Sequence, residues 1–431
     1  MPANLTPMMQ QYMQVKEKYP DCILMYRLGD FYEMFFEDAL VASKVLEIVL
    51  TGRDCGLEER APMCGVPYHA VEMYVNRLIE KGHKVAICEQ LTDPKESKGL
   101  VERDVVRIIT PGTIIEESML SERENSYIAS LYLFENSLGV AYCDVSTGAF
   151  YCLEIEGEGW AGELIDELAR IQPREIIAND AIFLQELLVK RLQSGYYIQC
   201  YSGSAYEISH ANSRLADHFG VADLKCFGCA GMSFAVPAAG ALMAYLEETQ
   251  KNALMHIRAI RPVTRSKFLR IDAASRRNLE LTKPLRADGS KRNTLLYLLD
   301  QTATAMGGRM LRAWIEQPLQ NIDDINGRLD AVEALHKKPI EREALGKALS
   351  SVYDIERLCS RIAYGSVNAR DCRALSQSLS CIPQILPILD LLKSGELRRI
   401  REALDPMEDI AGLLNSAICD DPPISLSLIH I

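Results

Sequence analysis

Short apolar runs alternate with amphipathic stretches over residues 1–116, a pattern that predicts a mixed α/β domain. Thr6-Pro7 favours a helix start, because a hydroxyl suits the cap and proline suits the first helical position. The apolar run 22–26 predicts a buried strand, and Leu28-Gly29-Asp30 predicts the turn after it. Residues 31–50 carry apolar side chains at three-to-four spacing and predict a helix. Further strands are expected at 85–91 and 105–113, with a helix at 73–82.

A second set of strand and helix patterns begins after a short linker, 117–123. Strand segments at 125–134, 137–155 and 174–180, with an amphipathic helix at 158–171, predict another α/β domain over 124–247. From 248 to 425 we expect no strands, because the apolar positions of 307–315 and 322–332 recur at helical spacing. The chain is therefore predicted to be a multidomain protein with two α/β domains followed by an all-α domain.

The charge balance is acidic overall and basic in one stretch. The net charge is −12, which argues against a nucleic-acid binder whose whole surface is basic. Residues 249–320 nevertheless hold 14 Lys and Arg against 5 Asp and Glu. This stretch is expected either to be solvated and paired with acidic groups or to face a nucleic-acid backbone. For Arg276 and Arg277, interdomain ion pairing and phosphate contact are equally expected.

Several classes of protein are excluded or disfavoured by simple patterns. No run of about 18 apolar residues predicts a membrane span, and the first residues do not resemble a signal peptide. Thirteen cysteines, an odd and scattered set, predict reduced thiols in the cytoplasm. Cys226 and Cys229 form the one CxxC motif, with His218 upstream, and two thiols in a turn are a better expectation than a metal site. No P-loop pattern is present.

The last six residues, 426–431, are LSLIHI. A DNA sequence that reads like a transposon sequencing adaptor encodes these residues, so we expect a non-native tail on a truncated gene. An uninterrupted native coding sequence through His430 would contradict this hypothesis.

The sharpest local motif is YRLGDFYEMF at 26–35. Taken alone, Asp30 and Glu33 have the spacing of a capping box, which predicts a capped helix start. Phe31 lies four residues before Phe35, which predicts a core aromatic. These local interpretations assign no function to the motif.

Longer stretches resemble the bacterial MutS family of DNA mismatch-repair sensors, in the order of that family and over residues 6–425. The segments that carry the resemblance are TPMMQQYMQVKEKYP, YRLGDFYEMF, APMCGVPYHAVEMYVNRLIEKGHKVAICEQL, DPKESKGLVERDVVRIITPGT, DVSTGAF, IDAASRRNLEL and NTLLYLLDQTATAMGGRMLRAWIEQPL. The resemblance implies a mismatch-recognition domain at 1–116, a ribonuclease-H-like connector at 124–247, and the first segment of a helical core and lever domain at 248–425.

In that family the phenylalanine of GDFYE is a wedge that enters the minor groove, which implies this role for Phe31. The physics fits, because an aromatic wedge kinks the duplex most cheaply where a base pair is already weak. The glutamate two residues further on in that motif maps to Glu33. If a base edge desolvates this carboxylate, its pKa should rise, and the protonated acid can donate to a base nitrogen. Normal pairs would leave it unpaired and would be penalised. Weaker candidates for DNA contact lie in family-like stretches; they are Arg53, Met63, Tyr68, His69, Lys98 and Arg107. For His69, a hydrogen-bonded loop histidine is equally expected.

The resemblance also implies partners and a missing activity. The expected partners are double-stranded DNA with mismatches or small loops, a second MutS subunit and the repair partner MutL. ATP and magnesium would bind in an ABC-type ATPase domain that these residues do not contain, so residues 1–431 should hold no cofactor and hydrolyse no ATP. The expected location is the cytoplasm, at the nucleoid.

Two alternatives remain open. The chain could be a naturally short DNA-binding or scaffold protein, and an ABC domain encoded downstream would exclude this. Alternatively, Asp144 with Glu154 or Glu163 could form a two-metal nuclease site, since ribonuclease-H-like nucleases carry a carboxylate on their first strand. An aspartate before Ser-Thr-Gly is more often a turn former.

Overall fold

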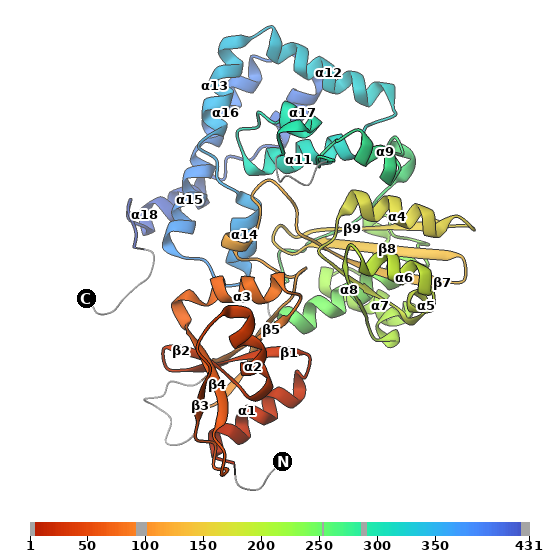
Figure 1. Ribbon diagram of the computed structural model, residues 1–431. Coiled ribbons are helices and arrows are strands. Elements are labelled where there is room, and N and C mark those ends of the chain that lie inside the picture. Colours follow the sequence, from red (N-terminus) through yellow and green to blue (C-terminus); the bar gives the residue numbers. More distant parts are fainter. Residues whose placement is uncertain (1–4, 92–100, 252–253, 286–290, 424–431) are drawn as a thin grey trace.

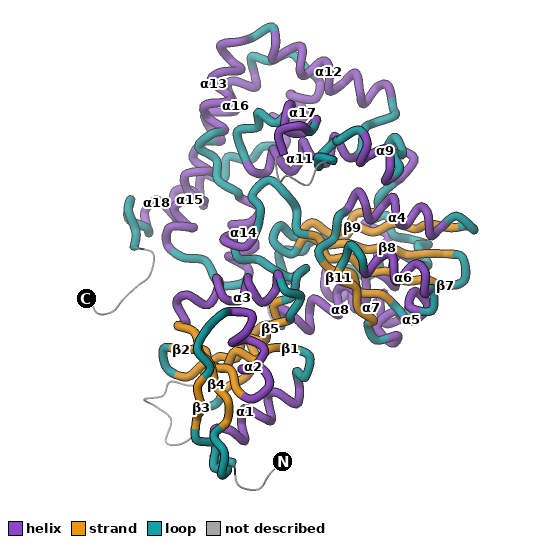
Figure 2. Tube along the Cα trace, viewed as in Figure 1, coloured by secondary structure: helices purple, strands orange, loops and turns teal. Residues whose placement is uncertain are grey.

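The computed structural model describes residues 5–91, 101–251, 254–285 and 291–423. Figure 1 shows a first sheet domain in red and orange, a second in yellow and green, and helices in teal and blue that extend away from both. Within these described ranges, strands are confined to the two sheet domains (Figure 2). The predicted order of two α/β regions and a helical region is confirmed. The predicted tail, 426–431, lies outside the described residues.

Within the described residues, the first sheet has six strands in the order β3-β4-β2-β1-β5-β6. These strands are β1 (Cys22–Leu28), β2 (Phe31–Phe35), β3 (Thr51–Arg53), β4 (Ala61–Pro67), β5 (Lys84–Gln90) and β6 (Arg103–Ile109). Helix α1 (Pro7–Lys18) covers one face, where Met9 and Leu24 belong to the same core. Helices α2 (Phe36–Leu46) and α3 (Val71–Glu80) contribute to the core on the other face. The helix predicted to begin after Thr6 and the strand predicted at 22–26 are confirmed.

The chain reverses direction after β1 through a two-residue loop, Gly29-Asp30. Leu28 and Phe31 are paired across this hairpin. Gly29 has a φ of +57°, which glycine adopts without the steric cost that a side chain would bring. The turn is therefore confirmed, but a strand follows it. The prediction of a helix over 31–50 is wrong for its first part.

The physical reason is that β2 pairs with strands on both sides, β1 and β4. Tyr32 and Met34 point into the core beneath α2 and α3, whereas Phe35 belongs to the core beneath α1. An apolar segment of this length fits either a helix or a buried strand, and hydrogen bonds to two neighbours favour the strand. Helix α2 then begins at Phe36, and the predicted apolar face at Ala39 is buried.

Within the described residues, the second sheet also has six strands, in the order β11-β10-β7-β8-β9-β12. These strands are β7 (Tyr127–Phe134), β8 (Ser137–Asp144), β9 (Ala149–Glu156), β10 (Glu175–Ala178), β11 (Tyr197–Cys200) and β12 (Ile260–Pro262). Helix α4 (Trp160–Ile171) packs on one face, in a core shared with α6 (Glu186–Gln193) and the short α5 (Asp180–Phe183). Helices α7 (Ile208–Phe219) and α8 (Ala235–Gln250) form the core of the other face.

Strand β12 corrects the expectation that strands end before residue 248. It runs parallel to β9, with Ile260 opposite Phe150, and so belongs to the second sheet. Its three residues are too few to show an alternating pattern, which explains why the sequence did not reveal it. The connecting segment after α8 therefore returns to the second sheet before the helical region begins.

The helical region consists of short helices around small cores. Its helices are α9 (Ala273–Asn278), α10 (Leu295–Leu299), α11 (Ala305–Glu316), α12 (Ile322–His336), α13 (Pro339–Leu349), α14 (Ile355–Ala363), α15 (Ala369–Ser380), α16 (Ile382–Asp390), α17 (Gly395–Ala403) and α18 (Glu408–Ala417). Leu358 and Leu375 lie in one core, and Ile385 and Leu397 lie in another. None of the described helices is long and apolar enough to span a membrane.

Candidate functional site

Phe31 is the first residue after the hairpin loop and lies at the start of β2. The residue is 47% exposed, although Tyr32 beside it is buried. It pairs with Leu28 on β1 and with Pro67 on β4, so the backbone beneath the ring is held on both sides. The local prediction of a core aromatic is therefore wrong. The sheet instead presents an aromatic side chain to the solvent on a rigid strand.

Glu33 lies two residues further along β2, and therefore on the same face of the sheet as Phe31. Its carboxylate accepts a hydrogen bond from Arg53 of β3, on the far side of β4. Gly65 of β4 lies opposite Glu33, and a Cβ there would touch the Glu33 side chain at 3.4 Å. Glu33 does not cap a helix, so the capping-box interpretation is wrong.

The ion pair between Glu33 and Arg53 is partly exposed to solvent. The Glu33 side chain is 17% exposed and the Arg53 side chain is 38% exposed. The Arg53 guanidinium passes Phe35, with 6.0 Å between its central carbon and the ring centroid. Met63, opposite Phe35 on β4, is partly buried against the core beneath α1. Met63 thus packs against the protein core, whereas Phe31 on the same sheet is exposed.

Tyr68 and His69 follow β4 and lie beside the hairpin loop. The backbone amide of Tyr68 donates to the carbonyl of Asp30 at 3.0 Å. Both side chains are exposed, and their rings meet edge to face with centroids 5.8 Å apart. We name the group of Phe31, Glu33, Arg53, Tyr68 and His69 the hairpin patch. Phe31, Glu33 and Arg53 lie on one face of the first sheet, where Glu33 and Arg53 meet, and Tyr68 and His69 follow β4 at the hairpin end of that sheet.

Arg27 belongs beside this patch, although the sequence did not single it out. Its guanidinium lies 3.9 Å from the ring centroid of Tyr68, a cation–π contact. Its Nε donates to the carbonyl of Gly29 at 2.5 Å, within the hairpin loop. The signal that could have found it is its place in the same motif, two residues before that glycine.

Arg107 lies away from the hairpin patch, on β6. It donates to Glu116 at 2.5 Å, to the carbonyl of Thr113 at 3.0 Å and to Gln250 of α8 at 3.0 Å. The side chain is only 16% exposed. These contacts connect the first domain to the second and occupy the guanidinium, so the contact between Arg107 and DNA stays a prediction that this arrangement disfavours. Lys98 lies outside the described residues.

Asp144 is fully buried and is used by its own turn. Its carboxylate accepts from the Ser146 amide at 2.9 Å, the Ser146 hydroxyl at 2.7 Å, the Ser126 amide at 3.1 Å and Asn125 Nδ2 at 2.8 Å. An oxygen pair that is saturated by donors has no lone pair directed at a metal ion. The turn-former interpretation is therefore confirmed.

The other two carboxylates of the nuclease alternative have separate structural roles. Glu154 accepts from the amides of Phe234 and Ala235 at 2.7 and 2.9 Å, at the start of α8. Glu163 of α4 pairs with Arg265 at 2.5 Å and with Arg270 at 3.3 Å. Among the described residues, no three His, Cys, Asp or Glu side chains are grouped to hold a metal. The geometry does not support the nuclease alternative.

The CxxC motif is not arranged as a ligand pair. Cys226 is exposed and its thiol lies 3.4 Å from the carbonyl of Asp223. Cys229 is buried, with its sulfur 3.9 Å from that of Cys152. His218 lies 2.9 Å from the carbonyl of Ile257. The interpretation as thiols in a turn agrees with this arrangement.

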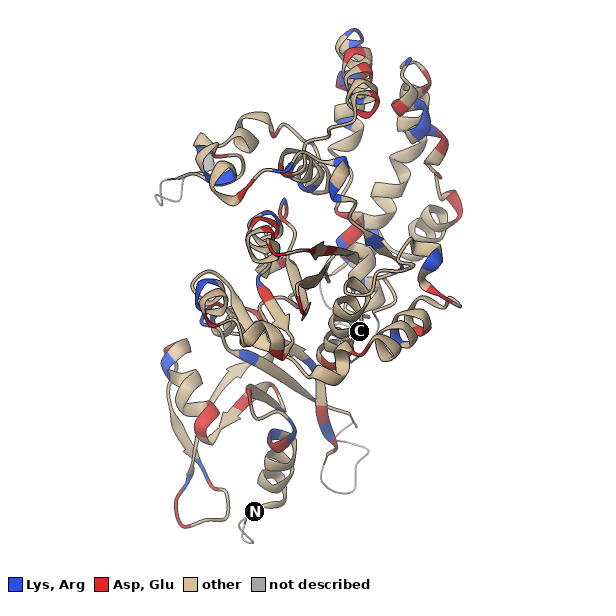
Figure 3. Cartoon of the chain, turned by 90° about the vertical axis from the view of Figure 1, so that its right-hand side faces the viewer, with Lys and Arg blue, Asp and Glu red and all other residues tan. Residues whose placement is uncertain are grey.

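Part of the positive charge in 249–320 is paired with carboxylates. Arg276 is buried against Glu316, and Arg312 pairs with Glu124 at 2.7 Å. Arg277, by contrast, is exposed. In Figure 3, Lys and Arg residues are interspersed with Asp and Glu along the chain. Pairing with acidic groups thus accounts for Arg276 and Arg312.

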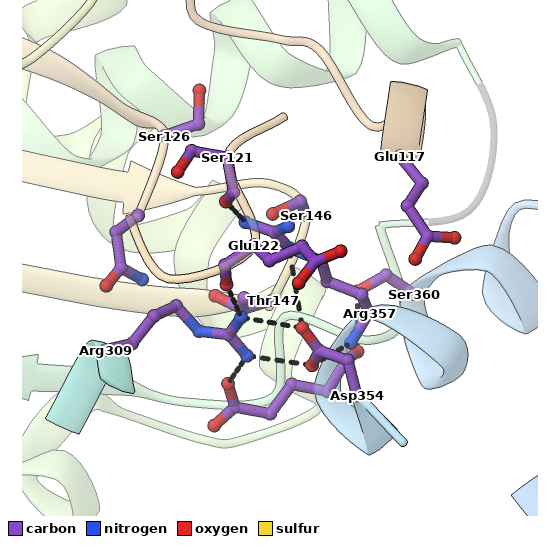
Figure 4. A network of polar contacts seen from close by, with 12 residues as sticks. Glu117, Ser121, Glu122, Ser126, Ser146, Thr147, Arg309, Asp354, Arg357 and Ser360 are labelled. Carbon is purple, nitrogen blue, oxygen red and sulfur yellow. Dashed lines mark hydrogen bonds and ion pairs between the residues drawn. The ribbon is translucent and has the colours of Figure 1, made fainter. Parts of the chain in front are cut away.

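A polar network anchors the linker between the first two domains to the helical region (Figure 4). Arg309 of α11 pairs with Asp354 at 2.6 Å and donates to the carbonyl of Glu122 at 2.9 Å. Arg357 of α14 donates to the carbonyls of Ser121 at 2.8 Å and Glu124 at 3.0 Å. The linker is therefore a fixed part of the structure, held by two buried guanidinium groups.

The fold and the site define a class of protein in which a sheet domain presents an exposed aromatic hairpin and a second sheet domain joins it to a helical region. Comparison with known families gives the same three parts. Residues 6–118 match MutS domain I, 126–258 match MutS domain II, and 274–431 match MutS domain III. The chain belongs to the MutS family, and it corresponds to the N-terminal region of that family.

Relatives are similar over nearly the whole chain. A protein of Lachnoclostridium phytofermentans is 47% identical over 426 residues, which cover 98% of this chain and 45% of the relative. One from Ruminiclostridium cellulolyticum is 47% identical, over 98% of this chain and 48% of the relative. One from Symbiobacterium thermophilum is 45% identical, over 99% and 49%. Each is named DNA mismatch repair protein MutS, and the chain spans about half their length.

Proposed function

We propose that this chain recognises mispaired or looped-out bases in double-stranded DNA as a part of mismatch repair, with Phe31 as a wedge. The observation that carries the proposal is the exposed Phe31 ring at the start of a strand that is paired on both sides. A minor-groove wedge of this kind partly unstacks a base step and kinks the duplex. A rigid strand suits the role, because a mobile loop would yield before the base stack does.

Selection of mismatches follows from the energy of deformation. Unstacking costs on the order of a few kcal/mol per base step, and it costs least where the pair is already weak. A phenylalanine ring forms no hydrogen bond with a base, so it tolerates many kinds of mispair. Recognition by deformability is indirect readout and needs no base-specific donor at the wedge.

Glu33 adds discrimination within this proposal. Its carboxylate lies on the same face as Phe31 and is paired with Arg53. To contact a base edge, Glu33 has to leave Arg53 and donate as the protonated acid. A normal base pair that offers no partner would leave the acid unpaired, which disfavours binding.

Tight binding to DNA needs more than the first domain. Residues 1–115 hold 13 Lys and Arg against 17 Asp and Glu, so the first domain has little electrostatic attraction for DNA. We therefore propose that a second MutS subunit and the helical region contribute to tight binding of DNA. The complex would then recruit MutL. ATP and magnesium would bind in the ATPase domain of the family. The location would be the cytoplasm, at the nucleoid.

The second domain would serve as a ribonuclease-H-like connector. Strands β7, β8 and β9 are antiparallel neighbours, and β10 joins the other side of β7 in parallel. This strand order supports the proposed fold type. The saturated Asp144 carboxylate supports a connector rather than a nuclease.

A gel-shift competition tests the wedge. Labelled mismatched duplex is displaced from the purified chain by unlabelled mismatched or matched duplex, and the ratio of the two competitor concentrations gives the preference. Phe31→Ala is expected to abolish the preference. Phe134→Ala is the matched control, because Phe134 is similarly exposed, at 53%, but lies on the second sheet. An unchanged preference in Phe31→Ala would refute the wedge role.

A further inference from the structure

Glu175, at the start of β10, is a fully buried carboxylate at the contact between the two sheet domains. Among the described residues, four groups donate to it. Its Oε2 accepts from the Thr110 hydroxyl and from the Gly112 amide at 2.9 Å. Its Oε1 accepts from Gln199 Nε2 at 2.8 Å and from the Tyr245 hydroxyl at 2.7 Å. Every partner is a donor, which suits a carboxylate that only accepts.

The two oxygens of Glu175 face different domains. Thr110 and Gly112 belong to the segment that directly follows β6 of the first sheet. Gln199 lies on β11 and Tyr245 on α8, both in the second domain. One carboxylate therefore binds the end of the first domain on one side and the second domain on the other. Hydrogen bonds to a charged acceptor are about twice as strong as neutral ones.

The segment 110–113 fits this contact closely. The Thr113 hydroxyl accepts from the Thr110 amide at 2.9 Å, which fixes the turn. A Cβ at Gly112 would lie 2.8 Å from Cβ of Ile128 and 2.9 Å from Cβ of Glu175. Any larger residue would push the two domains apart, so this contact requires glycine.

A continuous set of strands connects this contact to the hairpin patch. Lys84, at the start of β5, donates to Gln199, which itself donates to Glu175. Lys84 also pairs with Cys22, the first residue of β1. Strand β1 then runs to Leu28 at the base of the hairpin that carries Phe31. Force on the wedge would thus pass along β1 to the joint at Glu175.

We propose that Glu175 is a positioning residue that fixes the domain carrying the wedge against the connector. This role of Glu175 rests on the proposed function, since it gives Glu175 a part in bending DNA. With the joint intact, the reaction force from the bent duplex is carried into the second sheet. With the joint loosened, the first domain swivels on the duplex, and the wedge kinks it less.

The variant Glu175→Gln tests the positioning role. Its amide NH2 group would face two donors that Glu175 now accepts from, so the hydrogen bonds between the two domains are broken with little change in side-chain volume. Fluorescence energy transfer between dyes at the two ends of a mismatched duplex measures the bend at saturating protein. The bend of a bound complex does not change if a variant merely folds less well. Glu154→Gln is the matched control, because Glu154 accepts from the Phe234 and Ala235 amides within the second domain.

We expect Glu175→Gln to bend the mismatched duplex less than the wild type and to lose roughly fivefold in mismatch preference, the size of one or two hydrogen bonds. Glu154→Gln should match the wild type in both measurements. A Glu175→Gln protein that bends the duplex as the wild type does would overturn the positioning role. If this variant does not fold, Thr110→Val is measured instead, because it removes the hydroxyl that the first domain donates to Glu175. A smaller bend in Thr110→Val would support the positioning role, and an unchanged bend would overturn it.

The two variants distinguish a wrong wedge role for Phe31 from a wrong positioning role for Glu175. If Phe31→Ala keeps the preference, the wedge itself is wrong. If Phe31→Ala loses the preference while Glu175→Gln keeps both preference and bend, only the joint is wrong.

Discussion

The guanidinium of Arg53 donates a hydrogen bond to the carboxylate of Glu33 across an intervening strand. The two residues are twenty positions apart and come together because β3, β4 and β2 are neighbours in the sheet. Glu33 is therefore an ion-paired group on the same face of the strand as an exposed aromatic ring. Any contact between Glu33 and a base has to replace this pair. The pair is partly exposed, so the replacement costs on the order of 1 kcal/mol or less.

The role of Glu33 can be separated from its charge. Glu33→Gln should largely keep mismatch preference, because the amide can still donate to a base nitrogen. Glu33→Ala should lower the mismatch preference several-fold, because no donor remains at this position. Competition gel shifts with the same mismatched and matched duplexes measure both. A Glu33→Gln protein as impaired as Glu33→Ala would show that the carboxylate, not a donor, is what DNA binding requires.

The exposure of Phe31 predicts a small effect on stability. Phe31→Ala should change the free energy of unfolding by less than about 1 kcal/mol, as is usual for surface positions. Phe35→Ala, on the same strand but fully buried, should cost about 3–5 kcal/mol. Urea denaturation followed by circular dichroism measures both changes. Equal costs would mean that the Phe31 ring is packed in the folded protein.

The hairpin loop depends on the backbone conformation of Gly29. A Cβ at Gly29 would meet nothing within 4 Å, so the cost of Gly29→Ala comes only from its φ of +57°. We expect a loss of about 1 kcal/mol in the free energy of unfolding. Gly159→Ala is the control, because its Cβ also meets nothing and its φ is −84°. Equal thermal unfolding of the two variants would contradict the strained turn.

Asp144 should affect stability and not catalysis. Asp144→Asn is expected to cost about 1–3 kcal/mol, because a buried amide cannot accept from all the donors of the turn. Glu156→Gln, an exposed carboxylate at the end of β9, is the control and should cost almost nothing. Neither the wild type nor the variant should nick DNA in the presence of magnesium. Nicking by the wild type that is lost in Asp144→Asn would revive the nuclease alternative.

The Glu175 joint predicts a dependence on pH. Burial raises the pKa of Glu175 above its ordinary value of 4.5, and hydrogen bonds from Thr110, Tyr245 and Gly112 lower it in part. The titratable groups that face it from neighbouring elements are Tyr197, Tyr245 and Lys84. The folded protein then binds the proton more tightly than the unfolded chain does.

The sign of the pH effect follows from this difference. The contribution of Glu175 to the free energy of unfolding is largest below pH 4.5 and falls as the pH rises through the raised pKa. Glutamine does not titrate, so the stability of wild type relative to Glu175→Gln should fall over the same window. Urea denaturation at a series of pH values measures the difference. A difference that is independent of pH would contradict the raised pKa.

The sequence by itself determined the order of domains and most of the elements. The apolar run at 22–26, the proline helix start and the turn at Gly29-Asp30 are all local signals, and each is confirmed. Local signals succeed there because turn geometry, capping and periodicity depend only on neighbouring residues. The resemblance of motifs alone predicts that Phe31 and Glu33 belong to one site.

Only the tertiary structure decided what these residues face. Periodicity made 31–35 a helix, whereas pairing with β1 and β4 makes it a strand and exposes Phe31. No local pattern couples Glu33 to Arg53, or Arg107 to Gln250, since each pair is joined through packing between separate elements. Glu175 lay within a predicted strand, and its role as a joint depends on two domains that approach within hydrogen-bond distance. Such contacts depend on long-range geometry, which a pattern along the chain does not carry.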